Sequence, residues 1–139
     1  MPLETGDIKP LGVSPSVKLI EGNQIERTFK ARFMVRGHGP FAVDATKEEL
    51  EADAVRPKIR LFAEQIVQIL DGTTGITKIS LAPNASPEAN SQPLLNVEFR
   101  AGSQGPFSIL APSVPILVEP TIQAVKQRQA AVLAILDLK

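Results

Sequence analysis

Hydrophobic and polar residues alternate with a period of two along residues 25–36. One side of this run is apolar apart from Arg27, and it consists of Ile25, Phe29, Ala31, Phe33 and Val35. This period is typical of a strand whose sheet buries one face and exposes the other. Residues 41–45 alternate in the same way after a glycine-containing connection, so the two runs predict a β-hairpin. Residues 17–21 predict a shorter strand before it.

A helical period replaces the alternation from residue 54 onward. Apolar residues recur there at spacings of three and four, namely Val55, Ile59, Phe62, Ala63, Ile66, Ile69 and Leu70. The pattern predicts a helix from Ala54 to Leu70 that stops at Gly72, with Asp53 as its N-cap. Residues 46–49 have the form of a capping box. A helix begun there would run into a proline, so residues 46–52 are interpreted as a separate helical turn or a linker.

The chain repeats this pattern. Residues 31–71 align without a gap to residues 97–137, 66 positions later. The identities include Phe33 with Phe99, Gly39-Pro40-Phe41 with Gly105-Pro106-Phe107, and Ala45 with Ala111. The second copy predicts strands over 76–81, 95–101 and 107–111, followed by a helix over 120–136. The apolar stripe expected on that helix is Ile122, Val125, Val132, Leu133 and Leu136.

The expected fold is therefore α+β, built from an internally duplicated strand–strand–strand–helix unit. We expect one domain over residues 1–139, with an extended N-terminal arm over 1–16 and repeats over 17–72 and 73–139. One antiparallel sheet of about six strands with both helices on one face would bury both stripes. The halves should be related by a pseudo-twofold axis. The connection between them is too short for an interdomain linker, so they should share one core.

Composition excludes several classes of protein. The 139 residues include no cysteine, which rules out disulfides, thiolate catalysis and cysteine-based metal sites. The 15 basic and 15 acidic residues balance, and there is no Trp or Tyr, so no nucleic-acid partner is expected. No apolar run has membrane-spanning length and no signal peptide precedes the fold, so we expect no membrane partner. The expected location is the cytoplasm or an assembled particle.

The two halves differ in charge. Residues 1–72 carry 21 charged side chains, whereas residues 73–139 carry 9. The second half also has an apolar segment containing Val114, Ile116, Leu117 and Val118, where the first half is acidic. Depletion of charge with apolar enrichment favours a protein–protein contact, and coverage of the segment's own core is the alternative.

Arg128 and Gln129 interrupt the stripe of the second helix. They align with Phe62 and Ala63, which are apolar. A rotated, more exposed helix would explain the change. An oligomer seam with polar pairing across a twofold axis is the other interpretation.

The turn over residues 36–39 carries the most suggestive chemistry. Arg36, Gly37, His38 and Gly39 could hold an anion through a guanidinium, an imidazole and backbone amides. His38 is the only histidine, which leaves no second ligand for a metal. Catalysis by His38 would need an orienting carboxylate such as Asp44. His38 aligns with Gln104, so the turn does not require an imidazole.

No catalytic constellation or cofactor motif is present, and no cofactor or metal is expected. The leading hypothesis is a non-enzymatic structural or interaction protein that associates with itself or with other protein subunits. A homo-oligomer or a particle-, phage- or secretion-type assembly would suit such a subunit. The alternative is an anion-binding module at the Arg36–Gly39 turn. The third hypothesis is a hydrolase-like enzyme that uses His38.

Overall fold

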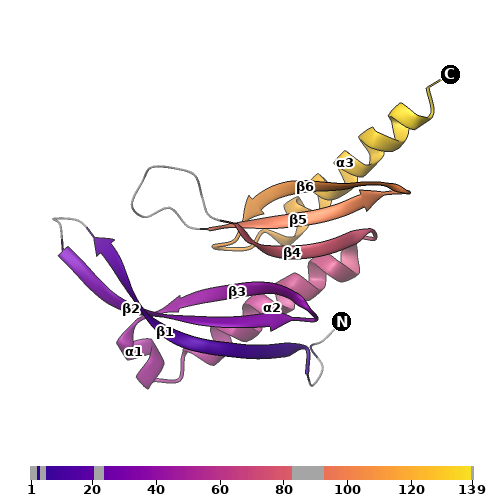
Figure 1. Ribbon diagram of the computed structural model, residues 1–139. Helices are drawn as coiled ribbons and strands as arrows, with labels where there is room; N and C mark the ends of the chain where they lie inside the picture. Colours follow the sequence, from indigo (N-terminus) through magenta and orange to yellow (C-terminus); the bar gives the residue numbers. More distant parts are fainter. Residues whose placement is uncertain (1–2, 4–5, 21–23, 83–92, 139) are drawn as a thin grey trace.

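The computed structural model describes residues 3, 6–20, 24–82 and 93–138 (Figure 1). These residues form six strands and three helices. In chain order they are β1 (Ile8–Ile20), β2 (Gln24–Val35), β3 (His38–Ala45), α1 (Lys47–Glu51), α2 (Val55–Gly72), β4 (Ile76–Ala82), β5 (Leu94–Ala101), β6 (Gln104–Pro112) and α3 (Val118–Leu136). The predicted α+β class is confirmed, and each half places three strands before its long helix.

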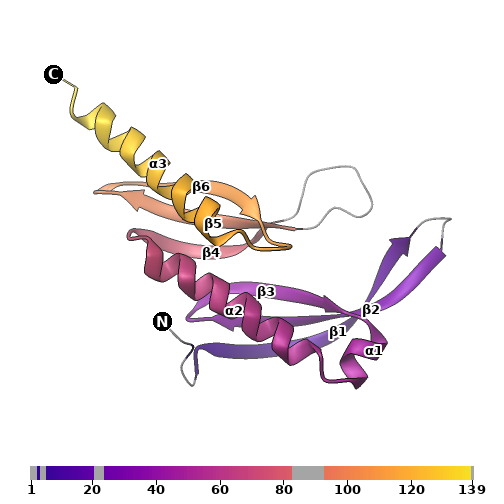
Figure 2. The same cartoon turned by 180° about the vertical axis from the view of Figure 1, so that it is seen from behind.

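The strands are divided between two sheets rather than joined in one. The sheets are antiparallel, with orders β1-β2-β3 and β4-β5-β6. Strands β3 and β4 lie side by side at the centre of the molecule in Figures 1 and 2. They share no backbone ladder, so apolar side chains and the His38 imidazole join the two edges instead.

The halves are related by a shift along the molecule, not by the predicted pseudo-twofold axis. His38 at the start of β3 bonds to Ile79 in the middle of β4. Asp44 near the end of β3 borders the same cavity as Pro93, which directly precedes β5, and Leu94 of β5 pairs with Ala82 at the end of β4. Strands β3 and β4 therefore run in the same direction. Figure 2 shows α2 and α3 also running in one direction on one side of the sheets, and a twofold axis would reverse one helix or move it to the opposite side.

The first strand begins at Ile8, not at residue 17. Residues 8–16, predicted to be an extended arm, therefore belong to β1, while residues 1–2 and 4–5 lie outside the described part of the chain. Strand β1 pairs along β2 from Ile8 opposite Val35. The sequence pattern did not predict this part of the strand because it contains Pro10 and Pro15. At the edge of a sheet a missing N–H costs no ladder bond, so proline is tolerated there.

Strands β1 and β4 share one irregularity in their pairing. In β1 the register shifts just after Pro10, which faces Phe33. In β4 it shifts just after Ile76, which faces Phe99. Beyond the shift, Val13 faces residue 31 and Ile79 faces residue 97. Since 31 and 97 are aligned positions, Val13 and Ile79 occupy corresponding places in the two sheets.

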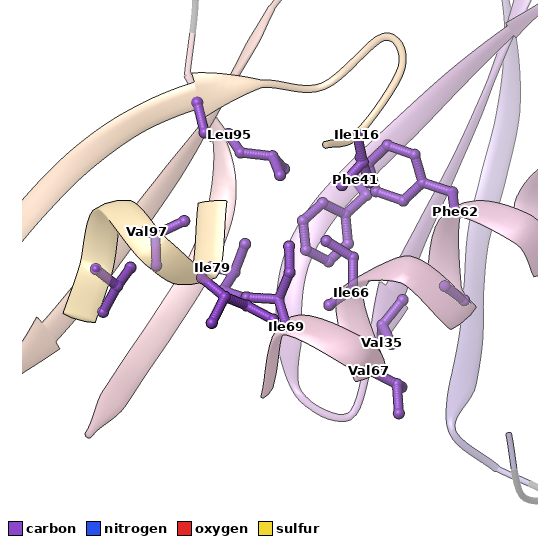
Figure 3. Packing of buried hydrophobic residues seen from close by; sticks show 14 of the residues in the cluster. Val35, Phe41, Phe62, Ile66, Val67, Ile69, Ile79, Leu95, Val97 and Ile116 are labelled. Carbon is purple, nitrogen blue, oxygen red and sulfur yellow. The ribbon is translucent and has the colours of Figure 1, made fainter. Parts of the chain in front are cut away.

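A single hydrophobic cluster contains residues from both halves (Figure 3). Phe41, Phe62 and Ile69 come from the first half, while Ile79 and Val97 come from the second. Both halves contribute fully buried side chains to this cluster, and a smaller cluster of Ala31, Ala45 and Val55 lies within the first half. The predicted shared core is present.

The helix boundaries depart from the prediction in two places. Thr46 and Glu49 form the predicted capping box, with both hydrogen bonds at 3.1 Å, and it starts the short helix α1. Asp53 is not the N-cap of α2, because that position belongs to Ala54 and has no side-chain cap. Asp53 instead binds the guanidinium of Arg56. Helix α3 begins two residues before the predicted Pro120.

Candidate functional site

The β2–β3 turn carries the residues predicted to bind an anion. Arg36 has a positive φ of 48° and already faces two carboxylates. Its Nε lies 3.3 Å from Asp7 Oδ1, and its Nη1 lies 3.6 Å from Asp71 Oδ1. The backbone N–H of Arg36 also donates to the carbonyl of Asp7 at 2.8 Å. The guanidinium thus ties the turn to the N-terminal segment and to the end of α2.

The imidazole of His38 joins the two sheets. Its Nδ1 accepts a hydrogen bond of 3.0 Å from the backbone N–H of Ile79 in β4. An accepting Nδ1 carries no proton, so this bond requires the neutral form of the ring. Partial burial, and secondarily the charge on Lys78, lower the pKa of His38. The environment therefore favours the form that makes the bond.

This geometry gives each predicted ligand side chain an intramolecular partner. Anion binding by Arg36, Gly37, His38 and Gly39 stays a prediction. It would place an anion beside the Asp7 and Asp71 carboxylates that already contact Arg36. Asp44, named as the carboxylate that could orient His38, lies six residues along β3. That separation corresponds to roughly 20 Å of extended strand, so the two side chains do not form a catalytic pair.

We expect acid to weaken the fold through His38. The unfolded chain binds a proton on this ring below pH about 6.5, whereas the folded chain does so only at lower pH. Between those two values the unfolded state holds more protons, so stability rises with pH in that window. The contribution should be complete above pH about 6.5 and decline as the pH falls below it. Urea unfolding midpoints measured between pH 7.5 and 5 would show this trend.

His38→Gln is the matched control for that titration. Glutamine occupies the aligned position 104, and its side-chain oxygen can accept the bond from Ile79 without titrating. The variant should lose part of the dependence between pH 7.5 and 5. Equal pH dependence in His38→Gln and the wild-type chain would show that His38 is not responsible.

A cavity of about 420 Å³ lies at the opposite end of β3, between the two halves. Its apolar walls include Leu61, Phe62, Val114 and Ile116. Its polar groups include Lys30, Asp44, Glu49, Lys58, Gln65 and Ser113. The sequence did not predict this cavity, because its walls come from separate parts of the chain.

Two charged side chains beside this cavity, Lys58 and Glu49, are paired with each other. The Nζ of Lys58 forms an ion pair with Glu49 and lies 3.4 Å from the carbonyl oxygen of Asp44. The hydrogen bond from Lys58, followed by the backbone N–H of Thr46, lowers the pKa of Glu49. Glu49 is therefore an ionised partner of Lys58 rather than a proton donor. These contacts tie α1 and the end of β3 to α2.

The apolar segment before α3 is partly buried within its own chain. Ile116 is buried in the core, and Val118 packs against the core from the start of α3. Val114 and Leu117 are exposed. Coverage of its own core thus accounts for Ile116 and Val118, while the predicted interface role of the exposed pair stays a prediction.

Gln129 has an intramolecular function that the alignment did not indicate. Its Nε2 lies 2.8 Å from the carbonyl of Thr74 and 3.0 Å from the carbonyl of Arg100. It therefore clamps the connection between the halves against the end of β5. Arg128, the other predicted seam residue, is exposed. Its role in an oligomer seam stays a prediction.

The final turns of α3 leave the body of the protein, as Figures 1 and 2 both show. We call residues 130–138 the α3 end. Its large exposed apolar side chains are Leu133, Ile135, Leu136 and Leu138. The predicted stripe is wrong here: Ile122 and Val125 are buried, but Leu133 and Leu136 are exposed.

A difference in aromatic packing between the two halves explains why the end of α3 lies away from its sheet while α2 stays packed. There, Phe33, Phe41 and Phe62 pack as a trio with ring centroids 5.3–5.9 Å apart, and Phe62 anchors α2. Arg128 stands where Phe62 would, so the second half keeps only a Phe–Phe pair. The sequence contained this signal, since Arg128 was already seen to interrupt the stripe.

Within the described ranges, no group of three or more His, Asp or Glu side chains is placed to hold a metal ion. None of the helices in the described part of the chain is long and apolar enough to cross a membrane. Comparison with protein-family models, with curated proteins and with solved structures finds no match to this chain.

Proposed function

We propose that this protein is a non-enzymatic structural subunit that associates with other copies of itself. The observation that carries the proposal is the exposed α3 end. Ile135 near the end of α3 is 65% exposed and Leu138, two residues beyond the helix, is 79% exposed, whereas Ile122 and Val125 nearer its start are buried. Several large exposed aliphatic side chains at the end of one helix are typical of a protein contact surface.

The energetic argument follows from the chemistry of these residues. Fully burying one leucine or isoleucine stabilises an interface by about 1.5–3 kcal/mol. The α3 end offers four such side chains, and its only charged described residue is Asp137. Charge is typically depleted at the centre of protein interfaces. These aliphatic side chains contribute no favourable free energy while they face water, but they do when a second subunit buries them.

We expect Ile135→Lys to weaken self-association about 10- to 100-fold, because one aliphatic side chain would no longer be buried in the contact. A cation near a helix C-terminus is favourable, so the helix itself should be retained. Sedimentation velocity over a concentration series would give the dissociation constants of the variant and the wild-type chain.

Gln127→Lys adds the same charge to an exposed position of α3 outside the α3 end. It should associate like the wild-type chain. A wild-type chain that remains monomeric at millimolar concentration would overturn the proposed function itself.

A further inference from the structure

The contact between the two halves offers a geometry for the contact between copies. The last turns of α2 are buried, and Val67 and Ile69 are both 0% exposed. The second half covers Ile69 in particular: α2 packs against α3, and Ile69 lies beside Ile79 in the core that also contains Val125 (Figure 3). The first half therefore presents a helix end and the edge of β3 to the second half.

The second half presents the same features, but among the described residues they are much less covered. Leu133 and Ile135 align with Val67 and Ile69, and they are exposed in the α3 end. Strand β6 aligns with β3, and among the described strands it pairs on one side only. The α3 end and the β6 edge thus reproduce the surface that the first half uses internally.

The opposite surface is also present and exposed. Val13 corresponds in register to Ile79, yet Val13 is 59% exposed whereas Ile79 is 0% exposed. Leu50 aligns with the buried Ile116 and is itself 40% exposed. Strand β1, like β6, pairs on one side only among the described strands. We call Val13 and Leu50, with the outer edge of β1, the β1 face.

The polar bond between the halves has a counterpart as well. Gln104 aligns with His38 and is exposed in the turn before β6. Val13 takes the place of Ile79, whose N–H points outward to His38. The Gln104 side-chain oxygen of one copy could accept the Val13 N–H of the next. At one position the two surfaces differ in charge. The buried Ile122 of the second half aligns with Arg56 of the first half. Arg56 is exposed and paired with Asp53, and such a charged pair is typical of the rim of an interface.

We infer that copies of this chain associate head to tail, with the α3 end of one copy on the β1 face of the next. This inference rests on the proposed function and adds the partner surface and its direction. The two surfaces are different, so the contact is heterologous and forms a closed ring or an open filament. The halves are related by a shift within the chain, and the same step between chains continues that series.

Two full-length double variants test the direction of the contact. Ile135→Lys with Leu136→Lys blocks the α3 end, and Val13→Lys with Leu50→Lys blocks the β1 face. Each variant alone should associate at least tenfold more weakly than the wild-type chain. An equimolar mixture should form a 1:1 dimer that does not grow with concentration, because each dimer retains one intact contact. Light scattering after size exclusion would measure these masses.

The outcomes separate the inference from the proposed function. A monomeric wild-type chain would overturn both. Unchanged association of the Val13/Leu50 variant, with loss in the Ile135/Leu136 variant, would keep self-association but overturn the head-to-tail contact. A mixture that stays monomeric would also overturn the contact, provided that circular dichroism shows both variants folded.

Cysteine cross-linking covers the case in which a lysine variant does not fold. The chain has no cysteine, so introduced thiols can form disulfides only with one another. Val13→Cys combined with Ile135→Cys should give a ladder of multimers on oxidation, while each single variant should remain mostly uncross-linked. Efficient dimers from Ile135→Cys alone would indicate a symmetric contact and overturn the inference.

Discussion

Replacing Phe41 with alanine should lower the free energy of unfolding by about 3–5 kcal/mol. The side chain is 0% exposed and lies between two other aromatic rings, with centroids 5.9 Å from Phe33 and 5.3 Å from Phe62. Alanine would remove the ring and leave a cavity that two sheets and α2 surround. Since domains of this size are stable by about 5–15 kcal/mol, the variant should be near its limit. Urea denaturation followed by circular dichroism would measure the loss.

Phe107→Ala is the matched control, because Phe107 aligns with Phe41 in the second copy. Phe107 is only partly buried and has a single ring partner, Phe99, at 6.0 Å. Its loss should cost about 1–2 kcal/mol, in proportion to the smaller area removed from water. Equal losses for Phe41→Ala and Phe107→Ala would show that Phe41 is no more deeply packed than Phe107, contrary to their burial in the structure.

Local patterns predicted the elements of this fold well. The alternation predicted over residues 25–36 matches β2 except for residue 36, which lies in the following turn, and the stripe from Val55 to Leu70 lies within α2. The capping box at Thr46 is present as predicted. These features depend on interactions between residues close in the sequence, so they can be inferred from spacing alone.

The relation between the halves could not be predicted in this way. A gapless repeat shows that two units resemble each other, but a shift and a twofold axis produce the same alignment. The direction is set by contacts distant in the sequence, such as the hydrogen bond between His38 and Ile79.

The burial of the apolar stripe on α3 was also assumed from its period alone. Its period is correct, but burial also depends on whether another surface lies opposite, and Leu133, Ile135 and Leu136 stay largely exposed among the described residues.

In the candidate site, too, the sequence indicated some features and missed those that depend on contacts distant along the chain. Alignment of the two copies pointed to the positions where they differ, and Arg128 stands at the position of Phe62, which packs against Phe33 and Phe41. It did not indicate that His38 bonds to β4, that Gln129 clamps the connection, or that Val13 corresponds to Ile79. The last of these requires the pairing register of β1, a strand that its prolines concealed.

Gly75→Ala should destabilise the protein by about 2–5 kcal/mol, because strain and overpacking act together. Gly75 has a φ of +86°, and an added Cβ would lie 2.7 Å from the backbone oxygen of Arg100. It would also lie 3.0 Å from the Gln129 amide nitrogen that clamps the connection. Arg100 is itself bound here, since its N–H donates to the Gly75 carbonyl at 2.8 Å. Thermal and urea unfolding would measure the loss.

Gly37→Ala separates the two causes of that loss. Gly37 has a similar φ of +80°, but an added Cβ would meet nothing within 4 Å. The substitution should therefore cost only the backbone strain, about 1–2 kcal/mol. The excess for Gly75→Ala measures how tightly the connection is held between α2, β5 and α3. If the two variants are equally stable, the connection can relax around a methyl group, and the halves are not rigidly joined at Gly75.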